Sequence, residues 1–306
     1  MSATATGGVL VPLDGSDVAE QALALGAACA RKVGAALHLV SVHEPMPPLG
    51  VPPDFPVEMA NLEQEWRLAL EQHLETAARS VEPGLPTPVV RSVIPGEPAA
   101  ALCGYVESHA VGLVVMTTHG RGGLSRMWLG SVADRMLRRL QVPLLLLHPR
   151  ELPQPTAFHR ILLALDGEIE EPVVEAAMAL GRMEPDVRYV VTRVVEPLIP
   201  VLSGLAARPA HLPRDWNELR ETEARNYLAR LTDRLRARGV DATSQVLVGR
   251  DVAQQVLRLA DAVAADCVVT GTHGGRGMER LLLGSVADKI VRGAKVPVLV
   301  APVRRR

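Results

Sequence analysis

Residues 271–285 read GTHGGRGMERLLLGS and directly follow the apolar run 267–270. The run is typical of a buried strand, and the apolar positions of 286–291 repeat with the spacing of a helix. A glycine-rich loop therefore joins the carboxyl end of a strand to the start of a helix. Glycines let a ligand approach the main chain closely, and the first N–H groups of a helix have no partner within it. Such a loop is a place where a phosphate group can bind.

The same stretch occurs a second time in the chain. Residues 117–131 read TTHGRGGLSRMWLGS, and Gly130 lies 154 positions before Gly284. The residues that follow repeat as well, because VAD comes directly after both Gly-Ser pairs. In a chain of 306 residues, a repeat of this period indicates two similar domains. We place them at 1–150 and 151–306, with a proline-containing linker over 149–158.

Composition narrows the class of protein. A net charge of −1 gives no overall attraction to nucleic acid or to anionic lipid. The chain carries neither an apolar run of the roughly 18 residues that a membrane span needs nor the pattern of a signal peptide. Cys29, Cys103 and Cys267 are widely separated, which predicts core packing in a reducing compartment. We therefore expect a cytoplasmic protein whose partners include neither nucleic acid nor membrane.

Both halves alternate strands with helices, which predicts an α/β fold with a parallel sheet and right-handed crossovers. Each half has five expected strands. They cover 9–13, 36–42, 88–93, 111–116 and 142–147, and then 161–165, 189–194, 244–248, 267–270 and 298–300. The helices include one over 17–32 and two long ones over 57–80 and 215–238.

The expected binding clefts follow from this topology. In doubly wound sheets, ligands bind beyond the carboxyl ends of the strands, where the strand order reverses. If the order reverses between the first and fourth strands, Asp14 and the loop 117–131 face one cleft. Asp166 and the loop 271–285 then face a second. The apolar last strands, 144–147 and 298–300, would be exposed edges, so we predict that they cover each other about a pseudo-twofold axis.

Glycines of the loop, a Gly-Ser pair at a helix start and an aspartate after the first strand recur together in both halves. This combination resembles the universal stress protein family in its tandem form, and the resemblance covers nearly the whole chain. The family pattern is Gly, two residues, Gly, nine residues, then Gly followed by Ser or Thr. Gly271, Gly274, Gly284 and Ser285 satisfy it in full.

The first half departs from the pattern at one position. Gly120, Gly130 and Ser131 match, but Thr117 stands in place of the leading glycine. A Cβ atom there would crowd the junction of ribose and phosphate and weaken this site. We expect the site to be occupied nevertheless, because the rest of the motif is kept.

The resemblance implies two Rossmann-like domains, of the adenine nucleotide alpha hydrolase-like type, that bind ATP without an established reaction. It implies that Asp14 and Asp166 contact the ribose and that the main chain of Val42 and Val194 reads the adenine edge. The glycine loops would hold the phosphates, with Mg²⁺ or Mn²⁺ as a candidate bridging ion. A structural interpretation also stands for each pair: a turn or cap for the aspartates, core packing for the valines. The implied ATP-binding residues are Pro12, Leu13, Asp14, Val42, Met116, Thr117, His119, Gly120, Arg121, Gly130, Ser131 and Val132 in the first half, and Ala164, Leu165, Asp166, Val194, Thr270, Gly271, His273, Gly274, Gly284, Ser285 and Val286 in the second.

Function is expected to be nucleotide-dependent regulation or stress response rather than catalysis. The sequence has no Walker lysine, and neither HxGH nor SGGxDS follows a first strand. His119 and His273 have no partner carboxylate in the motif, so no catalytic residue is predicted. Two alternatives stay open, namely slow ATP hydrolysis and an interaction scaffold that has lost its nucleotide. A homodimer is also plausible.

Several further side chains have two interpretations. The loop arginines either reach the phosphates or are solvated; they are Arg121, Arg126, Arg276 and Arg280. Trp66 and Trp216, on the long helices, are expected in the core or at an interface.

Overall fold

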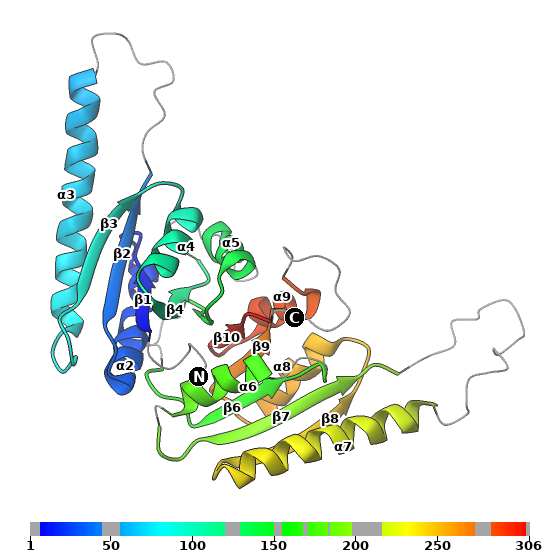
Figure 1. Cartoon of the computed structure of the whole chain (residues 1–306). Helices are drawn as coiled ribbons and strands as arrows, with labels where there is room; N and C mark the ends of the chain where they lie inside the picture. Colours follow the sequence, from blue (N-terminus) through cyan, green and yellow to red (C-terminus); the bar gives the residue numbers. More distant parts are fainter. Residues whose placement is uncertain are drawn as a thin grey trace, which may run out of the picture.

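A computed structural model of the chain describes residues 7–44, 56–119, 129–149, 155–167, 171–182, 184–197, 216–272 and 283–303, with side chains from residue 61 onward in the segment 56–119. Each half contains five strands and the helices between them (Figure 1). The first half comprises β1 (Gly8–Pro12), α1 (Asp17–Glu20), α2 (Leu23–Val33), β2 (Leu37–His43), α3 (Pro56–Val81), β3 (Val90–Pro95), α4 (Pro98–Ser108), β4 (Val111–Thr117), α5 (Ser131–Arg139) and β5 (Leu144–Leu147). The second half comprises β6 (Arg160–Ala164), α6 (Glu171–Gly181), β7 (Arg188–Val195), α7 (Trp216–Ala237), β8 (Asp241–Val248), α8 (Val252–Ala262), β9 (Cys267–Gly271), α9 (Ser285–Gly293) and β10 (Val298–Ala301).

The described strands form one continuous sheet in the order β3-β2-β1-β4-β5-β10-β9-β6-β7-β8. All neighbours within each half are parallel. The α/β fold and its parallel five-stranded halves are confirmed. The strand order reverses between β1 and β4 in the first half and between β6 and β9 in the second, as the expected clefts require.

The two halves meet where β5 and β10 pair as antiparallel strands, Leu144 with Val300, Leu145 with Leu299 and Leu146 with Val298. Leu145 and Leu299 are equivalent residues of the repeat, 154 positions apart, and they pair with each other. A pseudo-twofold axis therefore passes between them. The prediction that the last strands cover each other is confirmed.

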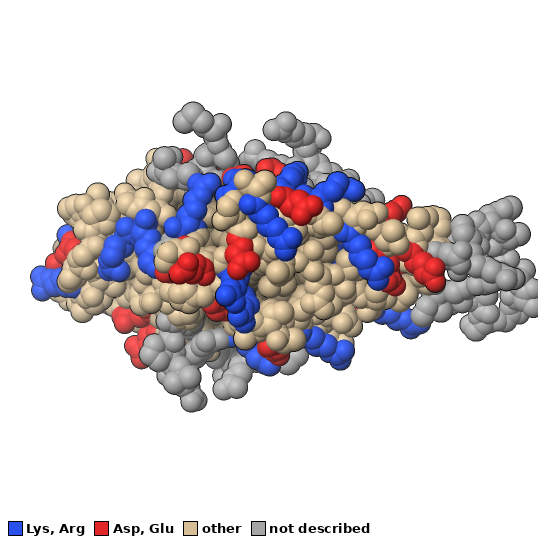
Figure 2. Space-filling model, turned by 90° about the horizontal axis from the view of Figure 1, so that it is seen from below, with Lys and Arg blue, Asp and Glu red and all other residues tan. Residues whose placement is uncertain are grey.

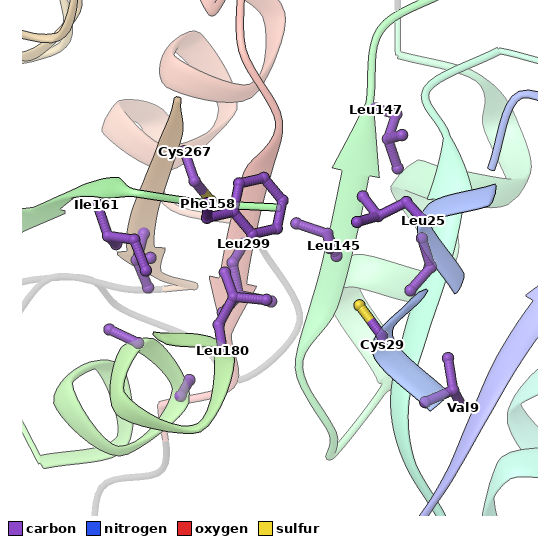
Figure 3. Close-up of a cluster of buried hydrophobic side chains, with 14 of the residues drawn as sticks. Val9, Leu25, Cys29, Leu145, Leu147, Phe158, Ile161, Leu180, Cys267 and Leu299 are labelled. Atoms are coloured by element: carbon purple, nitrogen blue, oxygen red, sulfur yellow. The ribbon is translucent and has the colours of Figure 1, made fainter. Parts of the chain in front are cut away.

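Helices cover both faces of the sheet. Buried side chains of α1, α2, α3, α6 and α7 form one core, and those of α4, α5, α8 and α9 form the other. Each core includes residues of both halves. In the first of these cores, Leu25 and Cys29 come from the first half, and Phe158 and Leu180 come from the second. They flank the paired strands β5 and β10 from either end of the sheet (Figure 3). The packing therefore makes one body from two repeats.

The duplication extends to backbone conformations. Gly15 and Gly167, after the first strand of each half, have φ values of 81° and 90°. Ala110 and Ala264, before the fourth strand of each half, both have φ of 49°. A left-handed alanine is strained, so its appearance at equivalent positions shows how closely the two halves share their backbone.

The structure differs from the sequence expectation in two places. The helix expected over 17–32 is two helices, because N–H groups of Gln21 and Ala22 bond to carbonyls three residues back and tighten the chain there. Trp66 and Trp216 are 50% and 36% exposed, so the interpretation of these residues as core is wrong. Their helices extend past the part of the sheet that could bury them.

The burial of the cysteines and the distribution of surface charge agree with what the composition predicted. Cys29, Cys103 and Cys267 are buried free thiols, as expected, and burial raises the pKa of Cys29 to about 12. On the face shown in Figure 2, basic and acidic side chains are interspersed. Within the described ranges, no helix has both the length and the apolar character of a membrane span.

Candidate functional site

A cavity of ≈ 1080 Å³ opens at the carboxyl end of the first-half strands, where the strand order reverses. Its volume is at the upper end of the roughly 300–1,000 Å³ that small-molecule sites occupy. All the described first-half candidates line it: Pro12, Leu13, Asp14, Val42, Met116, Thr117, His119, Gly130, Ser131 and Val132. The fold thus brings together residues that are up to 120 positions apart in the chain.

Asp14 holds the turn that ends β1. Its Oδ1 accepts hydrogen bonds from the Ser16 N–H (3.0 Å) and the Ser16 hydroxyl (2.6 Å). Ser16 in turn caps α1, because its Oγ accepts from the Ala19 N–H (3.2 Å). The structural interpretation of this aspartate is therefore correct. Its carboxylate also borders the cavity, so the turn fixes an acceptor at the cavity wall.

Val42 turns its main-chain groups toward the cavity. The Val40 carbonyl accepts from the Leu13 N–H (2.9 Å) on the β1 side, and the His43 carbonyl accepts from the Gly96 N–H (3.0 Å) on the β3 side. Alternate residues of a strand address the same neighbour, so Val42 faces the β1 side, like Val40. Since β1 ends at Pro12, the Val42 peptide lies beyond its last pairing partner. The Val42 side chain packs at the edge of the core, so the structural interpretation of this valine is correct.

Gly130 sits where the loop approaches β4. Its N–H donates to the Thr118 carbonyl (2.7 Å), and a Cβ atom on it would lie 2.9 Å from that carbonyl oxygen. Real Cβ atoms do not approach a main-chain oxygen so closely, so the position favours glycine for packing reasons. Gly130 is the N-cap of α5, and the first N–H groups of that helix border the cavity. These donors and the helix dipole favour an anionic group here.

Thr117 is buried at the end of β4. Its hydroxyl donates to the His119 carbonyl (2.7 Å), so the side chain is tied to its own loop. The residue that departs from the glycine pattern therefore stabilises the loop start while its surface still borders the cavity.

His119, two residues after Thr117, lines the cavity with an imidazole that can form hydrogen bonds. Its Nδ1 lies 2.9 Å from the Thr118 hydroxyl, and its Nε2 is buried without a protein partner. Burial lowers the pKa of His119, and the charge of Arg292 lowers it further. Arg292 belongs to α9 of the other half, so the two halves meet close to this loop.

The second half repeats the arrangement where it is described. Ala164 ends β6, and Leu165 donates its N–H to the Thr192 carbonyl (2.9 Å), as Leu13 does to Val40. The Val195 carbonyl accepts from the Gly249 N–H (3.1 Å), so Val194 faces the β6 side as Val42 faces β1. The other described candidates are Asp166 after β6, Thr270 and Gly271 at the end of β9, and Gly284, Ser285 and Val286 at the start of α9.

The Gly284 N–H donates to the Thr272 carbonyl (2.7 Å), the same bond that Gly130 makes to Thr118. The starts of α5 and α9 are therefore joined to the preceding strand by the same geometry. Gly120, Arg121, His273 and Gly274 lie outside the described residues, as do the loop arginines Arg126, Arg276 and Arg280.

Sequence reasoning missed part of the first cavity wall. The residues Gly15, His43, Glu44, Leu70 and His73 line it, and so does Trp66. Trp66, Leu70 and His73 belong to α3. The position of this helix over the sheet depends on packing between segments distant in sequence, so the sequence alone did not place these residues at the cavity. The helical spacing of Trp66 and Leu70 was the one signal available.

A family sequence model described as the universal stress protein family matches residues 7–148 and 157–302 of this chain. The chain belongs to the universal stress protein family. It carries two copies of the domain in tandem, as the repeat predicted.

Two relatives match this chain along nearly their whole length. A universal stress protein of Mycobacterium tuberculosis is 29% identical over 301 residues, which cover 96% of each chain. A second one from that organism is 26% identical over 325 residues, covering 99% of this chain and 98% of the relative. Among solved structures, a universal stress protein from Archaeoglobus fulgidus superimposes with a TM-score of 0.65 at 20% identity and covers 98% of both chains. A universal stress protein of Pseudomonas aeruginosa gives 0.59 at 17% identity, covering 98% of this chain and 94% of that one. These structural likenesses support the fold.

Proposed function

We propose that this universal stress protein binds ATP in both halves and regulates a stress response through nucleotide-dependent contacts. The observation that carries the proposal is the first-half cavity, in which Asp14, the Val42 peptide and the start of α5 surround one space. An adenine edge would meet the Val42 main chain, a ribose the Asp14 carboxylate, and the phosphates the Gly130–Ser131 helix start. The equivalent main-chain geometry at Val194 and Gly284 supports a second site.

A divalent cation fits this scheme as a partner of the phosphates. Among the described residues, no three His, Cys, Asp or Glu side chains gather as a metal site would require. Mg²⁺ binds in many proteins through substrate phosphates and water with few protein ligands. We therefore propose Mg²⁺ or Mn²⁺ as an ion carried in with ATP.

The protein acts by binding in this proposal. His119, the titratable loop residue at the first cavity, is held against Thr118, and its lowered pKa keeps the imidazole uncharged at neutral pH. A neutral imidazole beside a phosphate acts as a hydrogen-bonding group. Slow hydrolysis of ATP is the competing function, and a time course of ADP release tests it.

The experiment measures the identity and stoichiometry of nucleotide released from the denatured, purified chain. We expect two ATP per chain. Gly130→Val and Gly284→Val should each reduce this to one. A Cβ atom at Gly130 collides with the Thr118 carbonyl, and Gly284 makes the equivalent main-chain bond to Thr272. Gly104→Val is the matched control, since a Cβ there meets nothing within 4 Å.

One ATP in the wild type that Gly284→Val removes would mean that Thr117 has closed the first site. Chains that release no nucleotide, and bind none when ATP is added, would overturn the proposal and leave the scaffold interpretation. A Gly104→Val chain that loses nucleotide would show that the effect is general instability.

A further inference from the structure

The cavity continues beyond the proposed nucleotide contacts toward α3. This part, the α3 pocket, is lined by Gly15, His43, Glu44, Trp66, Leu70 and His73. None of these residues belongs to the glycine loop or to the helix start that would hold phosphate. Its role can be judged from the second half, where the repeat places equivalent residues.

The equivalences follow from the sheet register and from helix burial. Pro12 pairs with Val40 and Ala164 with Thr192, so Gly15 corresponds to Gly167 and Ser41 to Arg193. On the long helices, the buried run Leu74, Ala77 and Ala78 matches Leu228, Leu231 and Thr232 at a spacing of 154. His73 therefore corresponds to Tyr227.

In the second half, the protein fills the equivalent space with its own cation. The guanidinium carbon of Arg193 lies 5.5 Å from the centre of the Tyr227 ring. A Cβ atom on Gly167 would lie 2.6 Å from that same carbon, so the guanidinium rests directly on the glycine. A cation over an aromatic ring is stabilised by the ring's negative face. Arg193 thus occupies the space between the turn and the long helix.

The first half lacks this cation. Ser41 stands at the position of Arg193, fully buried, with its hydroxyl donating to the Leu13 carbonyl (2.8 Å). A serine is too short to reach the space between Gly15 and His73, and both of these residues line the open cavity. The place that Arg193 fills in one half is therefore accessible space in the other.

The groups around this space are those that recognise a cation. Glu44 lines the α3 pocket, and among the described lining residues of the cavity there is neither Lys nor Arg. Behind the pocket wall, Glu20 Oε1 lies 3.6 Å from His73 Nδ1 and adds a second acidic group close to the pocket. His43 and His73 line the cavity as well. Trp66 lines the cavity two helical turns before His73, so it offers an aromatic surface about 10 Å along α3 from that residue.

We propose that the α3 pocket binds a small organic cation, a guanidinium or a primary ammonium compound, in the place that Arg193 fills in the second half. This goes beyond ATP binding and does not depend on it, since the groups that contact the cation lie outside the phosphate loop. The two halves then differ in function: one long helix is closed by an internal arginine, and the other responds to a ligand.

Isothermal titration calorimetry of the full-length chain tests the proposal, with and without saturating ATP. The probe is agmatine, which carries a guanidinium and an ammonium group, and butylurea is the uncharged comparison. We expect saturable heat with agmatine, weaker at higher salt, and none with butylurea. Trp66→Ala should abolish the heat. Trp216→Ala, also a partly exposed tryptophan of a long helix, should leave it unchanged.

A second variant guards against loss of fold. Ser41→Arg gives the first half the residue of the second, and it should remove agmatine binding while far-UV circular dichroism stays native. The proposal is overturned if agmatine gives no heat, if butylurea gives the same heat, or if Trp66→Ala binds as the wild type does. Each of these results stands apart from the nucleotide count, so the two proposals can fail separately.

Discussion

Thr117 marks the position at which the two glycine loops depart differently from the motif: only the second loop has the leading glycine. It replaces the leading glycine of the motif, and its buried hydroxyl donates to the His119 carbonyl at 2.7 Å. In the second half, Gly271 has no side chain with which to make this bond. The first loop is therefore fixed at its start by the Thr117 side chain. At the start of the second, the Thr272 hydroxyl accepts a hydrogen bond from the Val303 N–H (3.0 Å) instead.

Substitution of Thr117 separates this bond from the bulk of the side chain. Thr117→Val keeps the shape but leaves the His119 carbonyl without its donor, so we expect a loss of about 1 kcal/mol in the free energy of unfolding. Thr117→Ser keeps the hydroxyl and should lose less. Urea denaturation followed by circular dichroism measures both, and equal losses would mean that the hydroxyl contributes nothing.

At the level of elements, the pairing of β5 with β10 decides how the halves assemble. Leu146 and Val300 are 0% and 1% exposed at this joint. A charged side chain there would be buried in the core shared by both halves without a partner. Leu146→Lys should therefore destabilise the protein by more than about 4 kcal/mol, the range of unpaired buried charges.

Thermal unfolding provides the measurement for this joint. Leu68→Lys is the control, because Leu68 is 47% exposed on α3 and should change stability by less than about 0.5 kcal/mol. If Leu146→Lys melts with the wild type, the antiparallel joint is wrong.

Much at this scale was predictable from sequence, for physical reasons. Mostly apolar runs of three to seven residues indicated the strands. The otherwise exposed apolar edges at 144–147 and 298–300 predicted that the last strands cover each other. The break between α1 and α2 was not visible, because it depends on a local tightening of hydrogen bonds within an otherwise helical pattern. The exposure of Trp66 was hidden too, since an apolar helix position does not reveal where the sheet beneath it ends.

The candidate sites follow the same division. Topology and the glycine motif predicted that Asp14 and Gly130 lie at one cavity, because parallel strands bring their carboxyl ends to one edge. The family resemblance added Val42. The difference between Ser41 in the first half and Arg193 at the equivalent position of the second could not be recognised as functional from the sequence, since neither residue belongs to a motif. Its effect depends on the distance from β2 to α3, which only the fold determines.

On the scale of the whole molecule, the halves differ in a polar cluster around the buried His38, which only the first half contains. His38 is 7% exposed, and its Nδ1 lies 3.0 Å from the Tyr105 hydroxyl. Tyr105 stacks on His109 with ring centres 3.8 Å apart, and its hydroxyl also lies 3.4 Å from Ser92 Oγ. The equivalent residues of the second half are Val190, Leu259 and Val263, all apolar.

This asymmetry predicts how the molecule responds to acid. Burial lowers the pKa of His38, and the nearby His109 lowers it further. The unfolded chain then binds a proton that the folded chain resists, so the stability contributed by neutral His38 is present above the unfolded pKa of 6.5 and is lost as the pH falls below it. Each unit by which the folded pKa is lowered corresponds to about 1.4 kcal/mol.

His38→Val, which copies Val190, should abolish that loss. Because the halves share one sheet and two cores, weakening the first should lower the melting temperature of the whole chain. We therefore expect the melting temperature of the wild type to fall further than that of His38→Val between pH 7.5 and pH 5.5. Circular dichroism and tryptophan fluorescence should report the same transition. A constant difference between the two proteins across that range would place the acid sensitivity elsewhere. Two separate transitions would show that the joint at β5 and β10 does not couple the halves.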